Sequence, residues 1–171
     1  MGVETLLAHE AIRQVLYRYC RGVDRGDAGL LEDVYHADAV DVHGAFKGNG
    51  HEFATHIVAN LDAVDGVAQH HITNVLIDLA ADGNSAQVES YFLAFHPYAE
   101  GEAERVAYVG GRYLDRFEAR DGAWRITHRE VVLDWAKADL PGDDWPAITN
   151  FSRGARRDAD PSARYAGTHR K

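Results

Sequence analysis

The chain has 171 residues, the usual size of a single domain, and 46% of them are hydrophobic against 26% charged. This composition excludes the fibrous, collagen-like and wholly disordered classes of protein. The 27 acidic and 18 basic side chains give a formal net charge of −9, which would repel a phosphate backbone, so we expect no nucleic-acid partner.

The sequence shows no targeting or membrane-spanning pattern. No stretch of 18 or more apolar residues occurs, and the N-terminus lacks a basic start followed by an unbroken apolar run. We therefore expect a cytoplasmic protein without a membrane partner. Cys20 is the single cysteine, which excludes an internal disulfide and zinc sites built on paired thiolates. The ten histidines form no helical His-x-x-x-His face, so we expect no metal.

The first third of the chain has mainly helical spacing. Apolar residues recur every three or four positions over residues 4–23, which predicts a helix packed on one side. These residues are Ile12, Val15, Leu16, Tyr19 and Val23. Asp27 fits the N-cap of a second, shorter helix. The alternating segment 39–44 predicts a short strand, and residues 50–64 return to helical spacing.

Four segments rich in β-branched and aromatic residues follow Gly66, separated by turn signals. They cover residues 67–80, 85–97, 104–119 and 123–135. Helices first and long strands second favour an α+β fold, in which a strongly bent, mostly antiparallel sheet wraps the helices. We place this domain at residues 1–136.

Residues 137–171 are predicted to be a C-terminal extension that covers a pocket or a neighbouring subunit. They contain too few apolar residues to pack as a unit of their own. Trp145, Ile148 and Phe151 fit one amphipathic turn that docks onto the domain.

Two adjacent histidines begin the first long strand. Histidine is the most frequent general base near neutral pH, and a carboxylate that fixes its tautomer improves it. Strand alternation predicts two faces, so the two histidines cannot share a site. One face carries His70, Ile72, Asn74 and Leu76, and the other carries His71, Thr73, Val75 and Ile77. The second face is the more apolar, which favours burial of His71, but a sheet that is also an oligomer interface buries both faces. Periodicity leaves the choice open.

Asp24 is the nearest candidate carboxylate in the first helix. It lies just past the predicted helix end, about a third of a turn from the centre of the apolar stripe that carries Tyr19. Spacing alone does not bring it into a pocket, and its ordinary interpretation is a solvated carboxylate at a helix end.

Three stretches together resemble the SnoaL-like branch of the nuclear transport factor 2 superfamily. They are "AIRQVLYRYCRGVDRGD", "HHITN" and "GGRYLDRFEARDGAWRITHREVVLDW", and the resemblance covers about residues 5–136. That branch includes scytalone dehydratase, bile-acid 7α-dehydratase and lindane dehydrochlorinase. The resemblance implies a cone-shaped α+β barrel and a cofactor-free reaction in which a proton is removed and a leaving group expelled.

The resemblance also implies which residues act. The family's histidine stands four residues before an asparagine, which selects His70 over His71, and the family's aspartate falls on Asp24. Tyr19 would donate to a carbonyl oxygen or protonate a departing hydroxide, and Arg129 would hold developing negative charge. Asn74 and Phe92 are expected to contact the substrate.

Three of these residues have structural alternatives. Tyr19 fits a core tyrosine with its hydroxyl hydrogen-bonded, and Asn74 could satisfy a strand edge. Arg129 could instead pair with Glu130 or Asp134 on neighbouring strands.

We predict a cofactor-independent, dehydratase-like lyase or isomerase, with polyketide cyclisation as a further option. Its substrate would be a small hydrophobic ring compound with a carbonyl group, such as a polyketide, a steroid or an aromatic intermediate. We expect a homo-oligomer, a dimer or trimer built on the outer face of the sheet. Two other functions stay open: a non-catalytic ligand-binding or scaffolding protein, and a structural protein like a dioxygenase small subunit. An enzyme requires Asp24 within hydrogen-bond reach of His70, with both facing a closed apolar cavity.

Overall fold

A computed structural model describes residues 2–63, 66–139 and 155–159 of the chain. Three helices and six strands form the domain. In chain order they are α1 (Val3–Arg25), α2 (Ala28–Val34), β1 (Tyr35–His43), β2 (Phe46–Asn49), α3 (Gly50–Asp62), β3 (Gln69–Leu79), β4 (Ser85–Glu100), β5 (Ala103–Arg120) and β6 (Ala123–Asp139). Residues 155–159 add one short 3-10 turn, η2 (Arg157–Ala159). Across the described residues, no helix combines the length and apolar character that a bilayer crossing needs.

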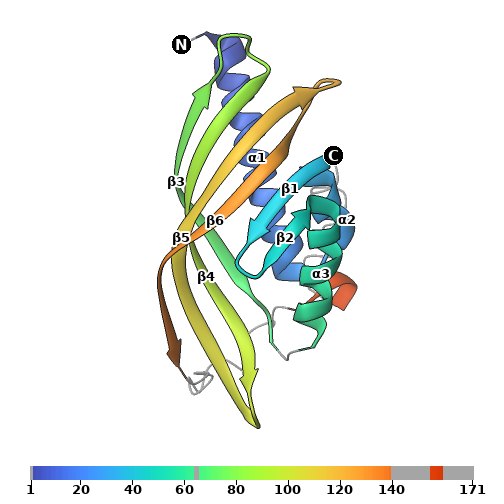
Figure 1. Ribbon diagram of the computed structural model, residues 1–171, viewed down its shortest axis with the longest axis vertical. Helices are drawn as coiled ribbons and strands as arrows, with labels where there is room; N and C mark the ends of the chain where they lie inside the picture. The colour runs from blue at the N-terminus through green and yellow to red at the C-terminus, as the bar shows by residue number, and fades with distance from the viewer. Residues whose placement is uncertain (1, 64–65, 140–154, 160–171) are drawn as a thin grey trace.

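The six strands form one mixed sheet in the order β2-β1-β6-β5-β4-β3. Only β1 and β6 run parallel, and every other neighbouring pair is antiparallel. The long strands β3 to β6 twist strongly, and α1 runs along the inner face of the sheet and contacts β3 and β6 (Figure 1). Helices α2 and α3 lie beside the β1–β2 hairpin. The predicted α+β cone is confirmed, as a curved sheet that does not close.

The predicted order of elements is confirmed, with three differences. Strand β2 and the parallel pairing of β1 with β6 were not expected, because a strand's partner is not written in its own periodicity. Strand β6 runs to Asp139, three residues past the expected end of the domain at residue 136. Trp145, Ile148 and Phe151, the expected docking turn, lie outside the described residues.

The apolar stripe of α1 is buried as predicted, and the helix ends in a glycine-containing cap at Gly26. Gly26 adopts a left-handed conformation with φ 62°, and the amide of Asp27 donates to the carbonyl of Gly22 at 2.9 Å, which closes a Schellman motif. The Asp27 carboxylate then accepts from the amide of Leu30 at 3.0 Å, which confirms it as the N-cap of α2. Asp24 is therefore held in the last turn of a helix with a fixed end.

Candidate active site

Asp24 and His70 meet although they are 46 residues apart in the chain. Nδ1 of His70 lies 2.6 Å from Oδ1 of Asp24, and the backbone amide of His70 donates to Oδ2 at 3.0 Å. Asp24 is only 8% exposed and the His70 side chain only 5%. The interpretation of Asp24 as a solvated helix-end carboxylate is wrong, because the end of α1 packs against the start of β3.

A β-bulge in β3 decides which histidine points inward. Ile72 pairs with Phe92 and Val75 pairs with Ser90, so Thr73 and Asn74 together face the single residue Tyr91. The extra residue moves Val75 and Ile77 onto the face of His70 and leaves His71 outside, where its ring contacts Phe95. The burial argument that favoured His71 assumed unbroken alternation, which the bulge interrupts.

The same bulge moves Asn74 away from Asp24 and His70, the pair that we call the dyad. Asn74 is exposed and lies on the outer side of the sheet, so the prediction that it shares a face with His70 is wrong. Phe92 is 4% exposed, lies on the inner face opposite Ile72, and stacks on Tyr113 at 4.5 Å between ring centres. A substrate contact by either residue stays a prediction.

The hydrogen bond between the dyad residues fixes the tautomer of His70. A carboxylate can only accept, so Nδ1 of His70 carries the hydrogen and Nε2 has a free lone pair. Among the described residues, none makes a hydrogen bond to Nε2. An open groove of about 340 Å³ between α1 and the edge strand β3 reaches both Asp24 and His70 from outside. The pair is thus oriented as a general base. The groove that reaches it is open and partly polar, and so differs from the closed apolar cavity that we expected.

Tyr19 and Arg129 meet deeper under the sheet. The guanidinium carbon of Arg129 lies 4.0 Å from the centre of the Tyr19 ring and 4.1 Å from that of Tyr113, so the cation is held between two aromatic faces. Burial raises the pKa of the Tyr19 hydroxyl, with Arg129 opposing the shift, so this hydroxyl stays protonated. Tyr19 is a core residue, as its structural alternative expected, and it is also a hydrogen-bond donor beside a buried cation.

Arg129 pairs with a residue that the sequence did not suggest. Its Nε and Nη2 donate to the two carboxylate oxygens of Asp115 at 2.8 and 2.7 Å, and neither side chain is exposed. The expected alternative partner Asp134 pairs with Arg112 instead. Burial by itself would lower the pKa of the Arg129 guanidinium, but Asp115 together with Tyr35 and Tyr19 more than compensates and raises this pKa well above its usual value. Its Nη1 is buried and has no partner among the described residues.

Three further polar residues on the inner face were missed from the sequence. Asp41 is fully buried and accepts a 2.6 Å hydrogen bond from the Tyr35 hydroxyl, His43 lies two residues further along β1, and His96 packs edge-on against His70 at 4.7 Å. Alternation along "AVDVH" could have grouped Asp41 with His43, because both share the face of buried Ala39. Nothing in the local sequence pointed to His96.

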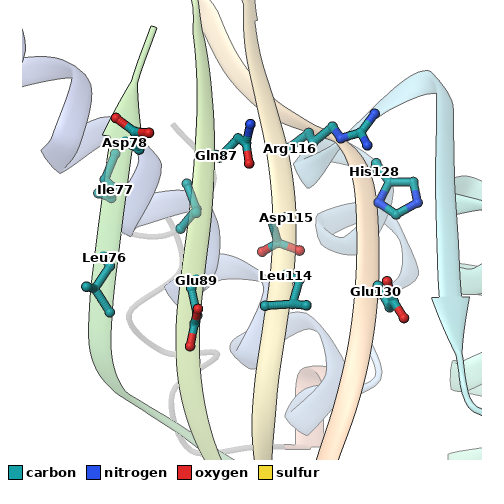
Figure 2. A pocket seen from close by; sticks show the side chains of 11 residues that line it. Leu76, Ile77, Asp78, Gln87, Glu89, Leu114, Asp115, Arg116, His128 and Glu130 are labelled. Carbon is teal, nitrogen blue, oxygen red and sulfur yellow. The ribbon is translucent and has the colours of Figure 1, made fainter.

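The outer face of the sheet carries a separate groove of about 520 Å³ (Figure 2). Its exposed lining mixes three carboxylates, from Asp78, Glu89 and Glu130, with Arg116 and His128. Among the described residues, no oriented acid–base pair like Asp24 and His70 lines this groove. It lies on the face that we expect to contact other copies of the chain, which stays a prediction.

No group of three or more histidine, cysteine, aspartate or glutamate side chains in the described ranges is arranged to hold a metal ion. The candidate site consists instead of the dyad and of Arg129 with Tyr19, Tyr113 and Asp115 around it, together with the inner-face residues between them.

Comparison with known protein families assigns the chain to one of them. The family model of the SnoaL-like domain matches residues 4–130 of the sequence. The chain belongs to the SnoaL-like family. No curated protein sequence matches it significantly.

Solved structures share the fold of this SnoaL-like chain. A hexachlorocyclohexane dehydrochlorinase, LinA type 2, is 21% identical with a TM-score of 0.73, covering 85% of this chain and 99% of that one. LinA type 3 from Novosphingobium barchaimii is 22% identical with a TM-score of 0.71 over 82% and 94% of the two chains. A scytalone dehydratase-like protein from Novosphingobium aromaticivorans is 22% identical with a TM-score of 0.69 over 84% and 98%. At these identities the similarity concerns the fold, the NTF2-like cone.

Proposed function

We propose that this SnoaL-like protein is a cofactor-independent lyase or isomerase that removes a proton next to the carbonyl of a hydrophobic ring compound. The observation that carries the proposal is the contact between Asp24 and His70, because it leaves Nε2 of His70 as a base with a fixed direction. The names of two structural neighbours, the dehydrochlorinase LinA and the scytalone dehydratase-like protein, both denote elimination and agree with this chemistry.

The reaction begins when Nε2 of His70 takes the proton from the carbon beside the carbonyl. Asp24 stabilises the imidazolium that forms, and it is well placed for this because both of its oxygens already bind His70. Negative charge then builds on the substrate's oxygen. Nη1 of Arg129 is buried and has no partner among the described residues, and Tyr19 with its protonated hydroxyl lies beside the guanidinium, so both are suited to bind that oxygen.

Proton abstraction can be measured without knowing the leaving group. We expect the wild-type protein to exchange the proton at C2 of 1-tetralone in D2O, and a panel of ring ketones up to a 3-ketosteroid defines the size of ring that fits. The substitution His70→Gln should slow the exchange by about 100-fold or more, the usual contribution of a positioned general base. Proton NMR follows the loss of the C2 signal over time.

The adjacent histidine gives the matched control. His71→Gln removes the same side chain one residue along the strand, on the outer face, and should exchange at the wild-type rate. Exchange that survives in His70→Gln, or a wild-type protein that exchanges no ketone of the panel, would overturn the proposal. In the second case, binding of the same ketones without exchange would favour the ligand-binding alternative.

A further inference from the structure

Two adjacent arginines of the C-terminal extension bind the two segments that carry the dyad. Nε of Arg157 donates to the carbonyl oxygen of Gly26 at 3.2 Å, at the cap that ends α1. Nη2 of Arg156 donates to the carbonyl oxygen of Gly66 at 2.8 Å, in the approach to β3. The two bonds join parts of the chain that are 131 and 90 residues apart. Neighbouring side chains thus link the end of α1 to the start of β3.

The end of α3 anchors both arginines. Nη2 of Arg157 lies 2.6 Å from Oδ2 of Asp62, and Nη1 of Arg156 lies 3.9 Å from Oδ1 of the same carboxylate. The hydrogen bond from Arg157 lowers the pKa of Asp62, so this carboxylate is charged at neutral pH. The short turn η2 therefore lies against the ends of α1 and α3 (Figure 1). We call Asp62, Arg156 and Arg157 the clamp.

The clamp and the dyad cross the same gap, between α1 and the edge of the sheet. Among the described strands, β3 is the last in the order β2-β1-β6-β5-β4-β3, so it pairs only with β4. The amide and the ring of His70 both bind Asp24, which joins this edge to α1. One clamp bond lies two residues after Asp24 and the other lies four residues before His70. A change in the distance between α1 and β3 would therefore disturb the clamp and the dyad together.

The chemistry of the clamp suits it to fix a geometry rather than to add stability. The side chains of Arg157 and Asp62 are 49% and 44% exposed, and an exposed ion pair contributes little to the free energy of unfolding. Two clamp bonds go to backbone carbonyls, and the planar guanidinium donates in fixed directions. A general base tolerates little displacement, because a misplacement of about 1 Å can cost about 100-fold in rate.

We infer that Arg157, together with Arg156 and Asp62, positions the dyad for proton abstraction. The kinetic part of this inference rests on the proposed function, in which His70 is the base. The clamp acts on the reaction only through the dyad. It holds the end of α1 against the start of β3, so that Asp24 stays 2.6 Å from Nδ1 of His70 and Nε2 keeps its direction. All three clamp residues are positioning residues.

The hydrogen bond of the dyad can be observed without any substrate. A proton between a ring nitrogen and a carboxylate at 2.6 Å gives a far-downfield resonance in the proton NMR spectrum, which His70→Gln assigns by removing it. We expect Arg157→Gln to shift this resonance upfield and to broaden it by faster exchange with water. The double variant Arg156→Gln with Arg157→Gln should lose the resonance.

Exchange at C2 of 1-tetralone in D2O gives the second measurement. The double variant should lower kcat for exchange by about 10-fold or more and leave KM close to the wild-type value, because the clamp acts on the base and not on binding. Arg157→Lys keeps a positive charge beside Asp62 and should recover part of the loss. The urea midpoint of the double variant should stay close to that of wild type, because the ion pair with Asp62 is exposed.

Arg120→Gln is the matched control. Arg120 is 40% exposed and lies 2.7 Å from both Asp38 and Glu118, so it also makes exposed ion pairs, and its substitution should change neither resonance nor rate. A wild-type resonance and kcat in the double variant would overturn the inference. Equal losses in Arg120→Gln, or a double variant that is largely unfolded in the assay, would show a merely structural role and overturn it too. A wild-type protein that exchanges no ketone would instead refute the role of His70, and the resonance would still test the clamp.

Discussion

Strands β5 and β6 join twice through an arginine and an aspartate, once on each face of the sheet. On the inner face, Arg129 of β6 binds both oxygens of Asp115 of β5, and both side chains are 0% exposed. On the outer face, Arg112 of β5 binds both oxygens of Asp134 of β6, with exposures of 28% and 39%. The two pairs have the same chemistry and nearly the same geometry, and differ in their contact with water.

This difference decides what each pair does. Both members of the outer pair are partly hydrated, and water and salt screen the attraction between them. This pair therefore adds little to the free energy of unfolding. The inner pair has lost its hydration, and each member needs the other to remain charged. Because Nη1 of Arg129 has no partner in the part of the chain that the structure describes, the inner pair also holds a cation in the interior, as the proposed function requires.

Breaking the inner pair should have the largest effect on stability. Asp115→Asn leaves the guanidinium of Arg129 buried without its counter-charge, and we expect the free energy of unfolding in urea to fall by about 3 kcal/mol. The double variant Asp115→Leu with Arg129→Met removes both charges and should lose less than the sum of the two single variants. An Asp115→Asn protein as stable as wild type would show that the buried pair matters no more to stability than the exposed one.

A second effect is expected on the inner face, where burial disfavours the protonated form of His96. Burial lowers the pKa of His96 to about 4, whereas in the unfolded chain it is about 6.5. The unfolded state therefore binds more protons between these values, and stability falls as pH drops through this window, by about 2 kcal/mol from pH 7 to pH 4.5. His96→Gln should remove that part of the acid sensitivity when urea unfolding is compared at the two pH values. An unchanged pH dependence would assign it to other groups.

The smallest effect is expected on the outer face. Asp134→Asn removes a carboxylate whose pKa is lowered by the hydrogen bonds that Arg112 donates to it. Water can take the place of this carboxylate beside the exposed guanidinium, and Glu89 stays near it. The shift in the urea midpoint should be less than a third of that for Asp115→Asn, and should shrink further in 1 M salt. A loss as large as that of the inner variant would mean that the outer face is covered in solution, for instance by another copy of the chain.

Local sequence predicted most of the elements but only part of the site. The stripe of α1, the N-cap at Asp27 and the four long strands follow from short-range spacing, since each depends on neighbours within a few residues. The choice of His70 came from the resemblance to the SnoaL-like branch. Alternation by itself left the choice open, and the apolar character of the second face leaned toward His71, because neither could include the bulge at Thr73 and Asn74.

The sequence by itself determined the α+β class, the order of helices and strands, and the family. Tertiary structure decided which polar groups meet. Arg129 pairs with Asp115 rather than Asp134, and His70 meets Asp24 and His96, because these contacts join elements that local sequence patterns do not relate. The position of a residue along a strand predicts which face of the sheet its side chain occupies. Its partner and its burial depend on how the curved sheet brings separate strands around α1.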